Sequence, residues 1–477
     1  MMKDLKKYKN KIYINIKRYI KFIVFLLFFF FYFLFFSSNN IINIIPNENN
    51  PKCTELDPIN ILDQRLKNGL MIICKNKSSN HICYKDKNSM LRIKNGVFCK
   101  MNNFVLDPSK WKNSGFIYKG PIDFVNKGCP LISKGFFNMN CKNNKVNEVN
   151  YLYNTYFESW NYEYFDNMEI EEELAPGKTI FFLSRNQDSP NLFHGGSELI
   201  NAISIMHLLK LVPEQIQIIF LESISINNDP FYDLYKNLIS RGGEPIYIKN
   251  LKKKYYIKSA IHLPINWDSP CFHNTEVPNC KYPTNTYILL NKLIDKYLTI
   301  ENYVDTFITD NSTYYYPKTT ITNHISGNDF KNAITIIWRR VWPKGRKGQT
   351  RILGNGPELA EKLALFLPKN ILIRLVDTAS LNINKQISIM KKTDYLVGIH
   401  GAGFTLSIFT PNTCIIHEIL PNNNLVMIME SLSGHKIYSD ETKVIKKNID
   451  NNEYLFIDVN DFVKNVINHM KENNFYE

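Results

Sequence analysis

Short apolar runs alternate with helical patterns in two successive series along the chain. The first series predicts strands over 179–183, 216–221 and 246–248, with helices over 198–211 and 231–239 between them. The second predicts strands over 334–338, 371–376, 395–399 and 414–419, separated by helices near 357–367 and 382–391. Strands that alternate with helices are typical of parallel sheets, so we predict an α/β fold with two Rossmann-like sheets. A last helix is predicted over 459–470, and we expect it to pack back across the pair.

The N-terminus has a different pattern, because an uninterrupted run of 15 apolar residues over 22–36 follows a basic tail at 1–21. The tail holds eight Lys or Arg residues against Asp4, a local charge of +7. A basic flank before an apolar run predicts a signal anchor with the C-terminus across the membrane. The run is short for a bilayer span, although it can extend into 41–45. A cleaved signal peptide is the alternative, but no small-x-small cleavage site follows the run.

Behind the anchor, composition divides the chain into four parts. Residues 37–52 are Asn-rich with two prolines and predict a flexible stem. The region 53–150 holds six cysteines and is predicted to be irregular. We place one Rossmann-like domain at 151–325 and a second at 326–477.

Charge and cysteine content narrow the class of protein. The net charge is +14, and half of it lies in the tail, so the rest of the chain does not have the charge distribution of a nucleic-acid-binding protein. All nine cysteines follow the anchor without the short paired spacing of zinc sites, which predicts disulfides in an oxidising compartment. Eight can pair, and we expect Cys414 to remain as a buried thiol; Cys271 and Cys280 are close in sequence, but spacing does not give the connectivity. Sequons begin at Asn76 and Asn311 and would lie on the luminal side.

The segment 394–405, DYLVGIHGAGFT, carries the strongest chemical signal. A buried strand over 395–399 leads to Gly398, His400, Gly401 and Gly403, where small residues let backbone N–H groups approach an anion. The following residues, 404–409, can begin a helix whose first amides face the same point. The alternative is a tight turn that any α/β protein needs between a strand and a helix.

Three motifs together resemble glycosyltransferase family 61. VGIHGAGFT at 397–405, followed by Ile416-His-Glu418, is similar to the family's signature; so are ITIIWRR at 334–340 with RILGNGPEL at 351–359, and NLFHGGSELIN at 191–201. The resemblance covers roughly 180–439 in the family's order. Phe404 replaces the family's usual Leu, and the insert at 341–350 is long, which leaves the alignment of Arg351 less certain.

The resemblance implies the GT-B architecture, two Rossmann-like domains that face a cleft, with the acceptor bound by the domain at 151–325 and the nucleotide sugar by the domain at 326–477. No D-x-D sequence is present to hold a metal against a diphosphate, so we expect a UDP-sugar donor substrate with no metal and no other cofactor. The Gly-rich turn would then bind the leaving UDP, and Ala402 and Thr405 belong to the same signature. Arg339 and Arg351 would add guanidinium contacts to the phosphates. His400 could donate a hydrogen bond to a phosphate, or it could simply brace the turn. Glu418 could accept hydrogen bonds from ribose hydroxyls, or it could have a capping or salt-bridge role.

Inverting transfer needs one general base to take the proton of the acceptor hydroxyl. His194 is the leading candidate, because imidazole accepts protons near neutral pH. Glu198 would lie one helical turn along the same face and would orient His194 or act as the base itself. The alternative is a structural role for His194 as a helix cap or core residue.

We therefore predict a glycosyltransferase in the Golgi or ER membrane that modifies secretory proteins or glycans. N-acetylglucosamine is the favoured sugar, by similarity to the family's EGF-domain transferase branch, and xylose stays open. A membrane-anchored relative that binds a sugar or protein without turnover is the alternative. An α/β hydrolase is excluded, because the chain has no G-x-S-x-G nucleophile elbow.

Overall fold

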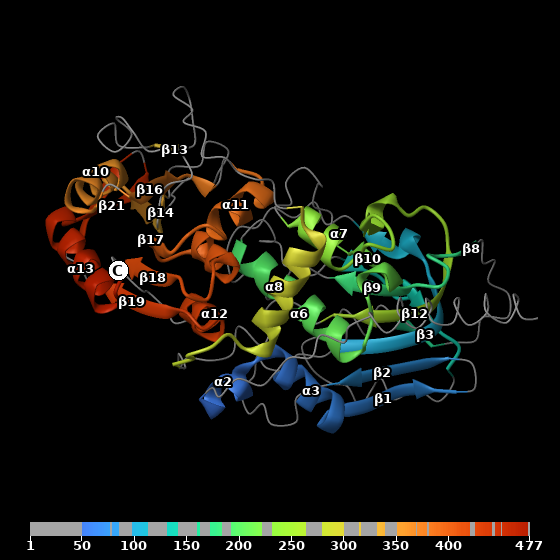
Figure 1. Cartoon of the computed structure of the whole chain (residues 1–477). Helices are drawn as coiled ribbons and strands as arrows, with labels where there is room; N and C mark the ends of the chain where they lie inside the picture. Colours follow the sequence, from blue (N-terminus) through green and yellow to red (C-terminus); the bar gives the residue numbers. More distant parts are fainter. Residues whose placement is uncertain are drawn as a thin grey trace, which may run out of the picture. The chain divides into compact units, whose positions relative to one another are not determined.

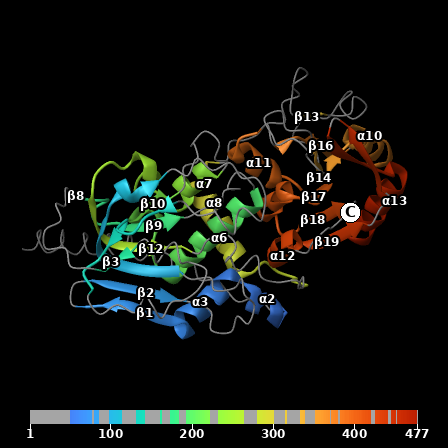
Figure 2. The same ribbon diagram turned by 180° about the vertical axis from the view of Figure 1, so that it is seen from behind.

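The computed structural model shows a mixed α/β protein (Figures 1 and 2). It describes residues 50–76, 79–84, 98–112, 131–141, 160–162, 172–183, 192–221, 231–263, 279–299, 314–315, 332–338, 351–368, 370–378, 381–419, 425–440, 444–449 and 451–475. Residues 47–477 form one compact unit, which contains every element below. The predicted anchor and cytosolic tail fall outside the described residues. Within those that are described, no helix combines the length and apolar character that a bilayer span requires.

The first sheet is mixed rather than parallel throughout. Its strands run in the order β1 (Leu70–Lys75), β2 (Asn80–Tyr84), β3 (Phe98–Leu106), β12 (Tyr255–His262), β9 (Thr179–Leu183), β10 (Ile216–Phe220) and β11 (Ile246–Tyr247). From β9 to β11 the neighbours are parallel, as the sequence predicts. β12 was not predicted as a strand, and it is parallel to β9. From β1 to β12 all neighbours are antiparallel. Short strands extend this sheet or pair beside it: β6 (Phe137–Asn138), β7 (Trp160–Asn161) and β8 (Glu172–Glu173).

The prediction of an irregular region over 53–150 was wrong for its described part. This part supplies four strands of the first sheet, β1, β2, β3 and β6, together with helix α3 (Pro58–Asn68) and most of helix α2 (Pro51–Leu56). These strands are hard to predict from the sequence because an antiparallel sheet can expose one face to solvent. In β3, Lys and Asn residues therefore interrupt the apolar pattern. The inner face is nevertheless well packed, with Phe104, Phe137 and Trp160 in one buried aromatic cluster.

Four helices of this half pack against one another: α3, α6 (Leu192–Leu208), α7 (Tyr232–Leu238) and α8 (Asn285–Tyr297). Helix α6 begins six residues before its predicted start at 198. Gly195 and Gly196 argue against a helix by propensity, but tertiary packing overrides that preference here. The helix is buried along most of its length. Short 3-10 turns are η1 (Pro108–Lys110), η3 (Pro213–Gln215) and η5 (Ile248–Asn250).

Three disulfides stabilise this half of the chain. Cys53 in α2 is bonded to Cys280 ahead of α8, Cys74 to Cys141, and Cys83 to Cys99. Cys280 therefore pairs across 227 residues and not with Cys271, its neighbour in sequence. Cys414 is a free, buried thiol, as predicted. Cys129 and Cys271 lie outside the described residues.

The second sheet follows the predicted order of elements. Its strands are β13 (Tyr314–Tyr315), β16 (Ile371–Val376), β14 (Asn332–Ile337), β17 (Tyr395–Ile399), β18 (Ile415–Ile419) and β19 (Lys436–Asp440). All neighbours are parallel except the edge strand β13. Two small sheets complete the list: β15 (Ile352–Leu353) with β21 (Asn452–Ile457) and β20 (Val444–Ile449), and β4 (Trp111–Lys112) with β5 (Leu131–Ile132).

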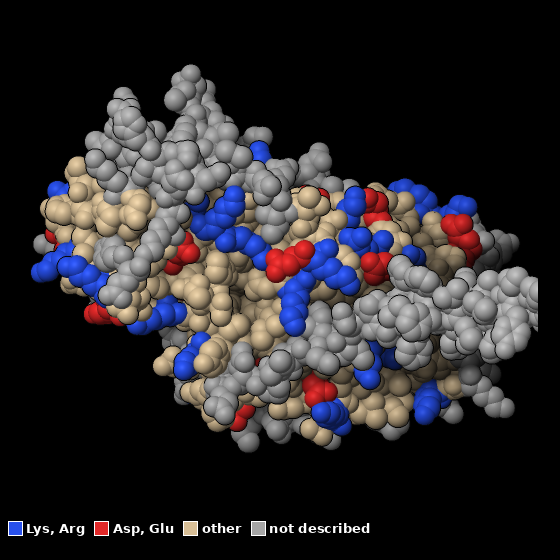
Figure 3. All heavy atoms as spheres, viewed as in Figure 1, with Lys and Arg blue, Asp and Glu red and all other residues tan. Residues whose placement is uncertain are grey.

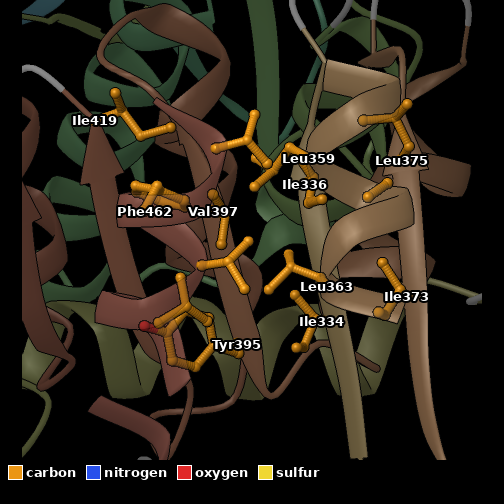
Figure 4. Close-up of a cluster of buried hydrophobic side chains, with 14 of the residues drawn as sticks. Ile334, Ile336, Leu359, Leu363, Ile373, Leu375, Tyr395, Val397, Ile419 and Phe462 are labelled. Atoms are coloured by element: carbon orange, nitrogen blue, oxygen red, sulfur yellow. The ribbon is translucent and has the colours of Figure 1, made fainter. Parts of the chain in front are cut away.

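Helices α10 (Gly356–Phe366) and α13 (Val459–Glu472) share one hydrophobic core with this sheet. Figure 4 shows Leu359 and Leu363 of α10 against Ile334 and Ile336 of β14, within the cluster that also holds Phe462 of α13. Helices α11 (Ile383–Met390) and α12 (Leu425–Leu432) instead contact η9 (Ala402–Phe409), the 3-10 helix that follows β17. The sheet is thus covered by separate groups of helices.

The elements around the two sheets are joined by specific contacts. The N–H of Thr284, just before α8, donates to the carbonyl of Leu432 in α12 (2.8 Å). Lys391 after α11 forms an ion pair with Asp295 of α8 (2.5 Å).

Figure 3 shows that Lys and Arg are interspersed with Asp and Glu over the face it draws. Helix α6 contacts η9 directly, and the candidate site lies there.

Candidate active site

The Gly-rich turn lies at the carboxyl end of β17, an inner strand of the second sheet. β17 is buried throughout and hydrogen-bonded to β14 on one side and β18 on the other. His400 and Gly401 follow it, and η9 begins at Ala402. The carboxyl end of a parallel sheet is where α/β proteins place their ligands. The helix predicted over 404–409 is present as a 3-10 helix that starts two residues earlier.

The glycines of the turn differ in whether the surrounding protein leaves room for a side chain. A Cβ at Gly398 would lie 2.6 Å from a ring carbon of Phe404, so packing requires glycine there. A Cβ at Gly403 would make ordinary contacts, 3.6 Å from Ile337 and 3.8 Å from Thr378. Gly401 has an extended φ of 159°, which any residue can adopt. The protein's own packing therefore explains Gly398 but leaves room for a side chain at Gly403.

Three consecutive backbone N–H groups, those of Gly401, Ala402 and Gly403, make no hydrogen bond to any residue that the structure describes. Their neighbours are occupied: the N–H of His400 donates to the carbonyl of Ile419 (3.1 Å), and that of Phe404 donates to Gly401 (2.9 Å). Adjacent N–H groups at the start of a helix form a binding site for an anion. The turn therefore offers three amide donors to one negatively charged group.

His400 is held beside this turn by Glu418 of β18. Nδ1 of His400 is 2.6 Å from Oε1 of Glu418, and the two side chains are 3% and 0% exposed. Oε1 of Glu418 therefore has a partner within the protein. A carboxylate on Nδ1 fixes the ring orientation and keeps the proton on that nitrogen. Nε2 has no hydrogen-bond partner among the described residues.

Helix α6 brings the first motif to the same place. The helix packs on η9, and a Cβ at Gly196 would be 3.0 Å from Cγ2 of Thr405. At Gly195 a Cβ would lie 2.5 Å from the ring of Phe231. The Gly-Gly pair thus lets α6 approach η9 and Phe231 closely, and it sets the distance between the two predicted motifs.

His194 and Glu198 lie one turn apart in α6, on the same face. His194 is half-buried and Glu198 is 4% exposed. Glu198 is the acidic residue of a helix that is buried along most of its length. The structure therefore places both candidate bases on the helix that packs against the Gly-rich turn.

The other predicted site residues are placed as follows. Arg351 has a left-handed φ of 63° and precedes β15, in the small sheet with β21. Among the described residues, no interaction joins Arg351 to the Gly-rich turn. Asn76 is exposed between β1 and β2, and its amide donates to the carbonyl of Asn140 (2.5 Å). Arg339 and Asn311 lie outside the described residues.

One buried acid near the turn was missed by the sequence prediction. Glu430 of α12 is fully buried, and both burial and the charge of Glu418 raise its pKa well above the ordinary value for a carboxyl. Burial lowers the pKa of nearby His435 to about 4 and raises that of the Cys414 thiol. An acid within the apolar segment LVMIMESL was the available signal.

The side chains with metal-ligand chemistry that gather among the described residues are His81, Cys83 and Cys99 in the first sheet. Both sulfurs belong to the disulfide between β2 and β3. Nε2 of His81 is 3.3 Å from the sulfur of Cys83, and its Nδ1 is 2.8 Å from the hydroxyl of Tyr162. This group is part of the core of the first sheet and lies apart from the Gly-rich turn.

The close approach of α6 to η9 can be tested with a compensating pair of substitutions. Gly196→Ala should destabilise the protein by about 1 kcal/mol, because the cost of crowding Cγ2 of Thr405 exceeds the gain from placing Ala instead of Gly in a helix. Thr405→Ser removes that Cγ2 and keeps the hydroxyl, so the double variant should recover most of the loss. The free energies of unfolding in urea for the four proteins give the coupling. Additive effects would show that the two residues do not touch.

A family model described as Glycosyltransferase 61 matches residues 137–416. The match includes the α6 motif, β14 and the Gly-rich turn, and it ends just before Glu418. A search of curated proteins found no match to the sequence.

Proposed function

The chain belongs to glycosyltransferase family 61, and from that premise we propose that it is an inverting, metal-independent transferase that uses a UDP-sugar. The observation that carries the proposal is the row of N–H groups at Gly401, Ala402 and Gly403, beside His400, that make no hydrogen bond to a described residue. In a glycosyl transfer the leaving diphosphate gains negative charge. Backbone amides fixed toward that charge stabilise it without a metal ion.

The sugar donor would bind in the second half of the chain. The diphosphate lies on the amides of the turn, with Arg339 and Arg351 available for further phosphate contacts. Thr405 is 1% exposed, and its hydroxyl has no hydrogen-bond partner among the described residues. Glu418 acts on the donor through His400, because its Oε1 already holds Nδ1 of that ring. This division of roles gives the GT-B arrangement, with the sugar donor on the second sheet and the acceptor on the first.

The acceptor hydroxyl would be activated from α6. His194 takes the proton as the hydroxyl attacks the anomeric carbon, and Glu198 orients the imidazole or takes the proton itself. Attack from the side opposite the leaving UDP inverts the anomeric centre. The position of α6 against η9 supports this assignment, since it brings the base toward the UDP site.

The cellular setting is part of the proposal. The segment 22–36 anchors the protein as a single-pass type II membrane protein, and the catalytic part lies in the lumen of the Golgi or ER. The three disulfides are compatible with an oxidising lumen. The acceptor is a hydroxyl of a secretory protein or glycan, and N-acetylglucosamine is the favoured sugar ahead of xylose.

A turnover assay with the full-length protein in detergent tests this function. We expect UDP release from UDP-N-acetylglucosamine in the presence of a Ser/Thr-containing acceptor, at a rate that EDTA does not lower. UDP-xylose, tested in parallel, distinguishes the two sugars, and mass spectrometry of the acceptor shows which one is transferred. UDP binding with no turnover for any donor would identify a binding protein that has kept the fold.

A further inference from the structure

Thr378 lies at the carboxyl end of β16, beside the open space in front of Gly403. The position of a Cβ on Gly403 is 3.8 Å from Oγ1 of Thr378 and 3.6 Å from Cγ2 of Ile337, so these two side chains border that space. Strand order explains the approach, because β14, which ends at Ile337, lies between β16 and β17 in the sheet. A hydroxyl group therefore lies next to Gly403, the last of the three residues whose N–H groups the turn offers.

The hydroxyl of Thr378 is available to a ligand. The side chain is half-buried, and its Oγ1 makes no hydrogen bond to any residue that the structure describes. Valine has the same shape as threonine, so packing alone does not explain a hydroxyl at this place. A hydroxyl donates one hydrogen bond, and the oxygens of a phosphate accept such bonds.

Gln386 of α11 holds the backbone of Thr378 in place. Its Nε2 donates to the carbonyl of Thr378 (2.9 Å) and to the carbonyl of Leu381 (2.8 Å), and the side chain is 4% exposed. The N–H of Leu381 also donates to the carbonyl of Thr378 (3.2 Å). One buried amide thus joins the two described ends of the segment that leads from β16 to α11. Thr378 is therefore placed before any ligand binds, which lowers the cost of binding.

The segment that carries Thr378 belongs to the same packed unit as the Gly-rich turn. Helix α11 contacts η9, the helix that begins at the turn. Residues 401–403 supply backbone N–H donors, and Nε2 of His400 has no hydrogen-bond partner among the described residues. A diphosphate has several acceptor oxygens on each phosphorus, so donors that come from different strands can bind it together. The hydroxyl of Thr378 would add a donor from β16 to those from the turn after β17.

We propose that Thr378 is a further donor-binding residue: its hydroxyl donates a hydrogen bond to a diphosphate oxygen of the UDP-sugar, and Gln386 is the positioning residue that holds Thr378 there. The inference rests on the proposed function, because it assumes that the diphosphate lies on the Gly-rich turn. It adds two residues to the site that the sequence prediction did not single out.

Isothermal titration of UDP into the full-length protein tests the hydroxyl with two substitutions of Thr378. Thr378→Val keeps the shape of the side chain and removes the hydroxyl, so UDP affinity should fall roughly tenfold, by about 1.4 kcal/mol. Thr378→Ser keeps a hydroxyl and should recover most of that affinity. Thermal unfolding should be the same in all three proteins, because the hydroxyl has no hydrogen bond to a described residue. A purely structural residue would show the reverse, with a loss of stability and unchanged affinity.

A second pair of variants tests whether Gln386 acts through Thr378. Gln386→Leu removes both hydrogen bonds to the segment, so UDP affinity should fall, and adding this change to Thr378→Val should cause little further loss. Additive losses would contradict the positioning role of Gln386. Should Gln386→Leu fail to fold, the two Thr378 variants still decide the inference.

The inference and the proposed function fail in different ways. Wild-type UDP affinity in Thr378→Val, or an equal loss in Thr378→Ser, would overturn the inference, while UDP binding by the wild type would still support the proposed function. Absence of UDP binding by the folded wild-type protein would contradict the proposed function and the inference with it.

Discussion

Replacement of His194 by Ala is expected to lower kcat by roughly 10²- to 10⁴-fold, the usual contribution of a general base. His194 lies in the first turns of α6, the helix that packs against the Gly-rich turn. UDP affinity should change by less than about twofold, because the proposed donor site lies at the second sheet and does not include this ring. Turnover is measured as UDP release with saturating donor and acceptor, and UDP affinity by titration.

Two further variants of α6 give this prediction its controls. His207, half-buried in the last turn of the same helix, should tolerate Ala with little loss of activity. Glu198→Gln keeps the size of the side chain and removes its charge. If Glu198 only orients His194, this variant should lose less activity than His194→Ala. An inactive Glu198→Gln beside a nearly normal His194→Ala would assign the base to Glu198 instead.

Gly403→Ala is expected to weaken UDP binding by roughly 100-fold or more without loss of stability. The new methyl would make ordinary contacts with Ile337 and Thr378, so the fold can accept it. Alanine in place of glycine within a helix even favours folding by roughly 0.5–1 kcal/mol. The methyl would, however, stand where the backbone N–H groups meet the diphosphate, and close approach to an anion is what glycine permits there.

Gly398→Ala is the matched comparison in the same turn. Its methyl would lie 2.6 Å from a ring carbon of Phe404, so this variant should lose stability through overpacking. Thermal unfolding and UDP titration of both variants separate the two roles. Normal UDP affinity in a folded Gly403→Ala protein would place the diphosphate elsewhere.

The second half of the fold was predictable because its strands are buried on both faces. β16 and β17 have the predicted bounds. A parallel strand that helices cover on both faces has a nearly continuous apolar sequence, which is easy to recognise. The antiparallel strands β1 to β3 mix buried positions with partly or fully exposed ones, and they were not recognised. The bond between Cys53 and Cys280 spans 227 residues, and no local pattern encodes it.

The candidate site was predictable only where a motif concentrates it in a short segment. His400 and the glycines around it belong to one such segment, and Glu418 follows in the next strand. Thr378 comes near Gly403 because β16 and β17 flank β14 in the sheet, and Gly196 meets Thr405 only after α6 packs on η9. These contacts depend on tertiary structure, so the hydrophobic periodicity of the sequence does not predict them.

The central claim is that the Gly-rich turn binds UDP through backbone amides without a metal ion. Isothermal titration of UDP into the full-length wild-type protein, once in EDTA and once in Mn²⁺, tests it most directly. We predict micromolar binding with the same affinity in both buffers, because the amides of Gly401, Ala402 and Gly403 supply the charge stabilisation. Binding that requires Mn²⁺, or no binding by the folded protein in either buffer, would contradict the claim.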